Sequence, residues 1–171
     1  MNMHKAPSPN QRFDPLAPAV EIISAFQKTA PIDVDAIAAA LGIEVVIDDR
    51  LPDDISGKIE RVGFFGDRYR ITVNGRHART RQRFTIAHEL AHFALHRSLI
   101  GDGIVDDAMY RSPRGDDVER QANSYAATIL MPAPLVRTYY RGGMKDFASM
   151  ARTFDVSPDM ARIRMRELRL G

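Results

Sequence analysis

Two histidines and a glutamate stand in the pattern His88-Glu89-Leu90-Ala91-His92, which has the spacing of a metal site. On a helix, residues four apart lie on one face, one turn above each other. The imidazoles of His88 and His92 can therefore reach one tetrahedral zinc ion at about 2.0–2.1 Å. Glu89 is turned by about 100° from His88, so its carboxylate can approach a metal-bound water without binding the metal. The pattern predicts zinc-assisted hydrolysis with Glu89 as the general base.

The residues around this pattern predict a helix that is buried on most sides. Between Phe84 and Leu95, the positions outside the pattern are almost all apolar. Burial of three ionisable side chains in such a helix is costly unless each has a partner, and a metal ion is such a partner. The alternative is a helix whose polar side chains are satisfied within the protein or face the solvent.

A catalytic zinc site needs a third protein ligand. His96 lies eight residues after His88, about 12 Å further along a straight helix, which is too far for a shared ion. The longer metzincin pattern would need glycine at position 95 and histidine at position 98, where this chain has Leu95 and Ser98. His96 is more simply a polar residue near the C-terminus of a helix.

Glu119 is the better candidate for the third ligand. It opens a predicted helix rich in small residues, Ala122, Ala126 and Ala127, which would let this helix pack closely against another. Asn123 lies one turn later on the same face and could hold the free ring nitrogen of a ligand histidine. The spacing leaves a second interpretation open, in which Glu119 is only a favourable charge in the first turn of a helix.

Apolar periodicity and capping residues predict the helices that would position these side chains. Asp33 or Asp35 can cap the second helix and Ser157 can cap the last one. Pro132 and Pro134 are expected to end the helix of Glu119. Helices are expected at about 20–26, 36–41, 81–96, 117–130, 145–153 and 158–168.

Strands are expected at about 43–47, 55–62 and 64–73, where β-branched and apolar residues alternate imperfectly. Gly57, Gly63 and Gly66 are turn or bulge points in this region. The dipeptide Asn74-Gly75 predicts a turn after the third strand.

The 171 residues have the composition of an ordinary globular domain, with 44% apolar and 27% charged residues and a net charge of +2. No cysteine is present, which excludes disulfides and cysteine ligands and fits a cytoplasmic location. No apolar run approaches the roughly 20 residues that span a bilayer. Residues 1–18 contain four prolines and no apolar core of a signal peptide, so we expect a flexible N-terminal arm there.

Basic residues gather before the predicted metal helix and in the last helix. The two groups are Arg76, Arg79, Arg81 and Arg83, and Arg162, Arg164, Arg166 and Arg169. A solvated surface explains them, and contact with an acidic partner or DNA is the alternative. Residues 154–166 resemble a helix-turn-helix, but their apolar residues more simply predict a hairpin packed on the core, so direct binding of nucleic acid is not expected.

Two segments together resemble the ImmA/IrrE family of zinc metallo-endopeptidases. They are Arg83–His92 and Glu119–Pro132, and similarities at 31–43, 55–57, 71–74 and 154–164 extend the resemblance to about residues 20–170. One departure is Ala91, which replaces the usual glycine before the second ligand histidine. The resemblance implies that His88, His92 and Glu119 bind one zinc ion in a gluzincin-like site and that Glu89 is the general base.

The resemblance also implies an α+β fold. We expect a small zincin-like domain in which the active-site helix packs on a short, mainly antiparallel sheet, followed by a C-terminal helical hairpin. The implied parts are the arm at 1–18, a zinc peptidase domain at 19–143 and a helix-turn-helix-like hairpin at 144–171 packed on that domain.

Members of this family typically cleave, or act with, a helix-turn-helix transcriptional repressor. The expected function is therefore endoproteolysis of such a repressor. The alternative is a zinc-containing toxin or anti-repressor that sequesters its partner, an antitoxin or repressor, without proteolysis. A donor for the oxyanion is also needed, and Tyr125, Tyr110 and His77 are open candidates for it.

Overall fold

The computed structural model describes residues 18–64, 68–100 and 113–171 of the chain. Its strands are β1 (Ile43–Asp48), β2 (Gly57–Val62) and β3 (Arg68–Asn74). Its helices are α1 (Ala19–Ala25), α2 (Val34–Ala40), α3 (Arg79–Leu95), the 3-10 turn η1 (Arg97–Leu99), α5 (Pro113–Leu130), α6 (Ala133–Arg141), α7 (Phe147–Phe154) and α8 (Pro158–Glu167). The predicted α+β class is confirmed.

No described helix combines the length and the apolar composition that a bilayer crossing requires. The arm expected at 1–18 lies almost wholly outside the described residues, because the description of this end of the chain begins at residue 18.

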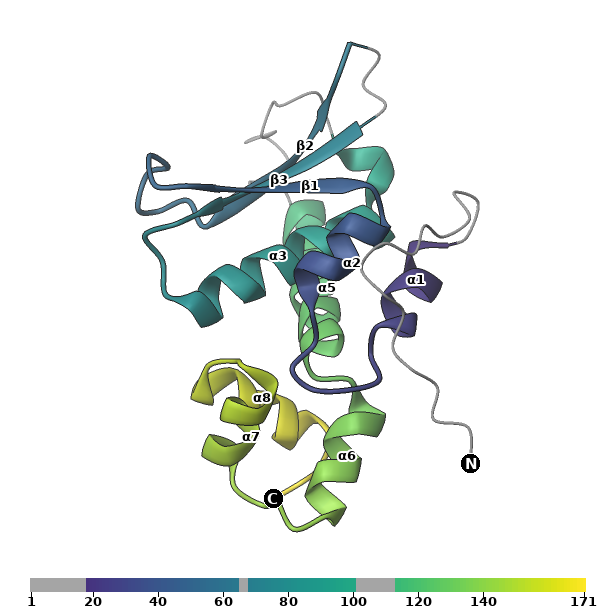
Figure 1. The fold of residues 1–171 in the computed structure, drawn as a ribbon, viewed down its shortest axis with the longest axis vertical. Helices are drawn as coiled ribbons and strands as arrows, with labels where there is room; N and C mark the ends of the chain where they lie inside the picture. The colour runs from purple at the N-terminus through teal and green to yellow at the C-terminus, as the bar shows by residue number, and fades with distance from the viewer. Residues whose placement is uncertain (1–17, 65–67, 101–112) are drawn as a thin grey trace.

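The three strands form one sheet in the order β1–β3–β2 (Figure 1). β2 is antiparallel to β3, with Ile59 opposite Ile71, whereas β1 is parallel to β3, with Val45 opposite Ile71. The sheet is therefore mixed, and the expected antiparallel pairing covers one of its two strand pairs. β3 is the central strand and lies between β1 and β2. The chain therefore forms the two outer strands before it forms the strand that joins them.

Helix α3 is the element that joins the layers of the fold. It contacts β2 and β3 of the sheet, α1 and α2 beside it, and α5. In Figure 1 the sheet lies at one end of the molecule and α6, α7 and α8 lie at the other, with α5 running between them. One continuous buried cluster runs through all of these layers, from Ile23 through Leu90 to Phe154. The division of the chain at residue 143 stays a prediction.

The predicted caps are present at two helices. The Asp33 carboxylate accepts a hydrogen bond from the Ala36 N–H at 2.9 Å at the start of α2. The Ser157 hydroxyl accepts one from the Met160 N–H at 3.2 Å at the start of α8. Each side chain satisfies a backbone donor that the first turn of a helix leaves free.

Helix α6 is an element that the sequence patterns did not predict. Pro132 and Pro134 follow the end of α5 at Leu130, as expected, but they also begin the next helix. Proline is well placed there because the first turn of a helix needs no N–H donor and the proline φ angle suits it.

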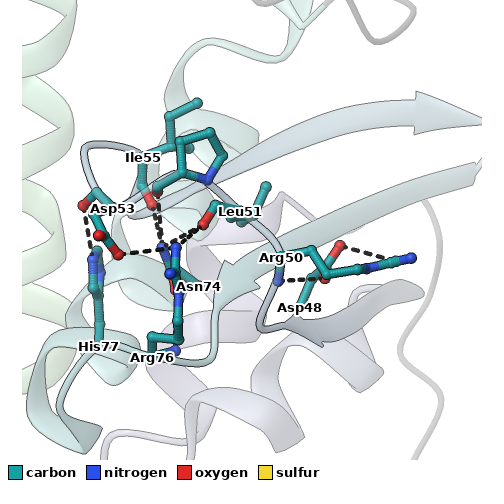
Figure 2. Close-up of polar contacts among 9 residues, drawn as sticks. Asp48, Arg50, Leu51, Asp53, Ile55, Asn74, Arg76 and His77 are labelled. Atoms are coloured by element: carbon teal, nitrogen blue, oxygen red, sulfur yellow. Dashed lines mark hydrogen bonds and ion pairs between the residues drawn. The ribbon is translucent and has the colours of Figure 1, made fainter.

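Asn74, the last residue of β3, is fully buried and anchors the turn that follows the strand. Its side-chain N–H₂ group donates to the carbonyls of Pro52 and Ile55, both at 3.0 Å, and its oxygen accepts from the Arg76 N–H (Figure 2). The turn predicted at Asn74-Gly75 is confirmed, and it joins β3 to α3. The same side chain also fixes the segment that leads into β2.

The arginines before α3 and in its first turns make contacts within the protein. Arg83 is buried, and its guanidinium donates to the carbonyls of Ile32 at 2.7 Å and Asp155 at 3.0 Å. Its pKa is lowered by burial, which the Asp155 carboxylate at 3.3 Å partly offsets. Arg79 also pairs with Asp155, at 2.9 Å, but its side chain is 77% exposed. Arg83 is thus a structural cation, unlike the solvated surface residue predicted for it.

We predict that Arg83→Met lowers the free energy of unfolding by about 3 kcal/mol, because two backbone carbonyls lose their donor and the Asp155 carboxylate keeps only its exposed partner, Arg79. Urea unfolding of the metal-free protein measures this effect. Arg79→Met is the matched control, since it removes a neighbouring exposed partner of the same carboxylate and should change stability by less than about 1 kcal/mol. Equal losses from the two substitutions would contradict the structural role of Arg83.

Candidate functional site

Helix α3 presents His88 and His92 on one face, one turn apart. Their ring centroids are 4.6 Å apart, and the two Nε2 atoms are 3.0 Å apart. The His88 side chain is 16% exposed and that of His92 is 9% exposed. Both rings therefore point their Nε2 lone pairs toward one shared position at the edge of the core.

Helix α5 brings Glu119 to the same position. One carboxylate oxygen, Oε2, lies 3.1 Å from His88 Nε2, and the other, Oε1, lies 3.1 Å from His92 Nε2. This approach is possible because the two helices pack through alanines, which let their backbones come close. Ala87 and Ala91 on α3 and Ala122 and Ala126 on α5 are fully buried.

The three side chains fit a zinc ion. In a tetrahedral site with bonds of about 2.0–2.1 Å, ligand atoms lie about 3.3–3.4 Å apart. The two nitrogens are 3.0 Å apart, and each lies 3.1 Å from a different oxygen of the Glu119 carboxylate. Ligand atoms taken one from each residue lie within 4.8 Å of one another. Two histidine nitrogens and one carboxylate oxygen are also a donor set of catalytic zinc sites, which keep a fourth position for water. Among the described residues, this is the one group of three such side chains that could hold a metal ion.

Asn123 lies one turn after Glu119 and holds the other nitrogen of His88. Its Oδ1 is 3.1 Å from His88 Nδ1. An amide oxygen only accepts hydrogen bonds, so His88 Nδ1 carries the proton and Nε2 is free to bind a metal. This is the contact that the predicted role of Asn123 requires, and the role itself stays a prediction.

His96 lies next to the group without belonging to it. Its ring centroid is 5.5 Å from that of His92, but its Nε2 faces the Gln121 side chain, 3.1 Å from Oε1. Its Nδ1 is buried and has no hydrogen-bond partner. His96 is therefore outside the group of three side chains that could hold a metal ion, and that it is not a ligand stays a prediction.

Glu89 is almost completely buried beneath β2. Burial raises the pKa of its carboxyl group, and the nearby His88 and His92 rings and the backbone N–H of Ile59 partly offset this effect. A buried carboxyl with a raised pKa can both accept and return a proton near neutral pH. The contact with Ile59 in β2 had no signal in the sequence.

Gly57 allows β2 to approach α3 this closely. A Cβ atom at this position would lie 2.5 Å from Thr85 Cγ2 and 2.6 Å from the Thr72 carbonyl oxygen. The glycine predicted as a turn or bulge point is therefore a point of close contact between the first residue of β2 and the active-site helix.

The charges of the three candidate ligands depend on one another. Burial opposes ionisation of Glu119, but hydrogen bonds from His88 and His92 and their positive charges lower its pKa to about 2. Burial also opposes protonation of His88. The Glu119 hydrogen bond and the charges of Glu89 and Glu119 outweigh this burial and raise the pKa of His88 above its usual value. Without a metal, the site therefore favours a proton on His88 beside an ionised Glu119.

The three candidates for the oxyanion donor lie in different places. Tyr125 lines a separate pocket with Leu95 and Gln121. His77 precedes α3, and its ring contacts the Asp53 carbonyl at 3.1 Å (Figure 2). The start of α3 at Arg79 is already about 13 Å along the helix axis from His88. Tyr110 is outside the described residues. Among the described residues, neither Tyr125 nor His77 makes a hydrogen bond or a ring contact with His88, His92 or Glu119.

Comparison with known proteins places this geometry in a family. The model of the IrrE N-terminal-like domain, Peptidase M78, matches residues 38–166, which include all the residues of the group. No relative among curated proteins matches the chain.

A solved structure described as a Mycobacterium tuberculosis transcriptional regulator is similar to this chain, with a TM-score of 0.54 and 21% sequence identity. The similarity covers 86% of this chain and 45% of that chain, so this chain corresponds to less than half of the regulator. At this identity the similarity shows a shared fold. The resemblance found in the sequence is confirmed by the family match, and the chain belongs to the family of the IrrE N-terminal-like domain, Peptidase M78.

Proposed function

We propose that this protein is a zinc-dependent endopeptidase in which His88, His92 and Glu119 hold the metal and Glu89 is the catalytic base. The observation that supports this most strongly is the convergence of two imidazole nitrogens, 3.0 Å apart, on one carboxylate, whose two oxygens each lie 3.1 Å from one of the nitrogens. The family match supports a peptidase, because the residues it covers include this group. Zinc is the proposed ion because its preferred ligands and bond lengths suit this donor set.

A zinc ion bound there would act as a Lewis acid that acidifies water and polarises a peptide carbonyl. The Glu89 carboxylate takes a proton from the water whose oxygen attacks the carbonyl carbon. A carbon–oxygen bond forms and the carbon–nitrogen bond of the peptide breaks. Glu89 then delivers its proton to the leaving amine. Its raised pKa favours uptake of the proton from water and keeps the proton on the carboxyl until the amine accepts it.

The position of β2 supports an extended polypeptide as the substrate. Within the described residues, β2 pairs with β3 on one side and is an edge of the sheet. It lies over Glu89, which its Ile59 N–H contacts. An edge strand can bind an extended chain through main-chain hydrogen bonds, and here this would place a peptide bond beside the metal position.

We further propose that the substrate is a helix-turn-helix transcriptional repressor in the cytoplasm. The proposal rests on the family resemblance and on the solved regulator, whose description links this fold to control of transcription. Direct binding of DNA by this chain is not proposed. Arg83 and Arg164 are buried and donate to backbone carbonyls within the protein, so they are not available to phosphates.

Glu89→Gln should leave zinc binding intact and lower the rate of peptide cleavage at least about 100-fold, because the amide cannot accept the proton from water. Zinc content is measured on the purified variant. Cleavage is measured by mass analysis of fragments after incubation with the product of any neighbouring repressor gene. Cleavage by the variant at the parent rate would show that Glu89 is not the base.

The same variant separates proteolysis from sequestration. If the protein acts as a toxin or anti-repressor that only binds its partner, Glu89→Gln should still relieve repression in a reporter assay. Loss of both cleavage and derepression is the result expected for an endopeptidase.

Zinc affinity should rise with pH and level off above pH 6.5. Zinc needs the neutral imidazole, and the raised pKa of His88 means that protons compete with the metal up to a higher pH than usual. Glu119 stays ionised throughout, because its pKa is about 2. Titration with a chromophoric chelator at several pH values measures this dependence.

Two substitutions serve as controls for this titration. Glu119→Gln should move the midpoint to lower pH, because it removes a charge that raises the pKa of His88, and it should weaken zinc binding more than Asn123→Ala does. The loss for Asn123→Ala should be about 10–100-fold, as for other partners of ligand histidines. An unchanged affinity in the Glu119 variant would contradict its role as a ligand.

A further inference from the structure

A groove lies between the first half of α3, the middle of α5 and the outer face of α8. Its volume is about 640 Å³, within the range of roughly 300–1,000 Å³ that is usual for ligand sites. Phe84 on α3, Ala127 on α5, and Met160 and Ile163 on α8 give it an apolar lining. Ile163 is 54% exposed, which is unusual for an isoleucine that faces no partner within the described residues.

The groove lies beside the metal group, although none of the three candidate ligands lines it. Asn123 lines it, and the same side chain holds His88 Nδ1 at 3.1 Å. Phe84 also lines it, and the centroid of its ring is 6.3 Å from that of the His88 ring. On α3, Thr80, Phe84 and His88 are successive residues four apart, so one face of the helix runs from the groove to the metal position.

Each charged side chain that lines the groove has a partner, and that of Arg120 is Asp117. Asp159 pairs with Arg162 at 2.8 Å and Glu167 pairs with Arg164 at 3.0 Å. Arg81 donates to the Ser56 hydroxyl at 2.9 Å. Because these charged side chains have partners, the apolar side chains of the lining are the main surface that a bound group would contact.

The walls of the groove are fixed to the same helices that carry the metal group. Arg164 is buried in α8 and donates to the Met131 carbonyl at 3.0 Å and to the Thr128 hydroxyl at 3.2 Å. These bonds attach α8 to the end of α5. The distance between the groove and the metal position is therefore set by α3 and α5, which suits a subsite that selects a side chain near the scissile bond.

We infer that this groove is a specificity subsite that receives a large apolar side chain of the substrate, on one side of the bond that is cleaved. The inference rests on the proposed function, which supplies the extended peptide that β2 and the metal position would hold. The groove would be the part of the proposed peptidase that determines which peptide bond is cleaved. Substrates are expected to carry leucine, isoleucine, methionine or phenylalanine at one fixed distance from the cleaved bond.

Cleavage of a degenerate peptide library by the zinc-loaded full chain, followed by sequencing of the products, tests this selection. One position should be enriched in large apolar residues. Ile163→Glu should lower the ratio of kcat/KM for a leucine peptide to that for the matching serine peptide by about tenfold, because a carboxylate then enters the apolar wall. No enriched position, or an unchanged ratio in the variant, would overturn the subsite.

Ile47→Glu is the matched control, because Ile47 is also an exposed isoleucine, at 52%, and lies on the outer strand β1. It should keep the parent ratio. Circular dichroism and zinc content show that both variants are folded.

A binding measurement tests the groove without catalysis. N-acetyl-leucyl-leucinamide is titrated into the zinc-loaded Glu89→Gln protein and the methyl signal of Met160, assigned with Met160→Leu, is followed by NMR. This signal should shift in a saturable way with the leucine probe and not with N-acetyl-seryl-serinamide. No shift would refute the groove even if the library is cleaved, whereas a shift without any cleavage would retain the groove and refute the peptidase.

Discussion

The contact between α3 and α5 is the interaction on which the rest of the structure depends. It holds an ionised carboxylate, Glu119, against two imidazoles at 3.1 Å, at the edge of an apolar core. Such a charge is costly to bury unless cations or a metal compensate for it. Alanines on both helices make the close approach possible, so packing of small apolar side chains and convergence of polar ones are parts of one arrangement.

The surrounding elements hold these two helices in place. On one side, Gly57 lets β2 lie directly on α3, above Glu89. On the other side, Arg83 connects α3 to the segment before α2 and to the turn between α7 and α8. Arg164 attaches α8 to α5 in the same way. The small sheet and the C-terminal helices therefore both position the metal group, and the groove between α3, α5 and α8 follows from this arrangement.

Local signals in the sequence predicted the features that depend on near neighbours. The spacing of His88 and His92 and the caps Asp33 and Ser157 follow from helix geometry within a few residues, and all are observed. Pro132 and Pro134 gave an ambiguous local signal, since prolines that end one helix can begin another, and α6 was missed for this reason.

Features that depend on contacts between distant parts of the chain could not be predicted from residue spacing alone. Glu119 lies 27 residues beyond His92 along the chain, so the spacing left its role open and the family resemblance was needed to choose. The parallel pairing of β1 with β3 and the burial of Arg83 likewise depend on tertiary contacts that no local pattern encodes.

Anomalous diffraction at the zinc absorption edge, from crystals of the zinc-loaded protein, tests the central claim most directly. The account predicts a single strong peak within about 2.2 Å of Nε2 of His88, Nε2 of His92 and one carboxylate oxygen of Glu119, with Glu89 outside bonding distance. A zinc ion bound elsewhere, or one held by the two histidines with Glu119 turned away, would contradict it.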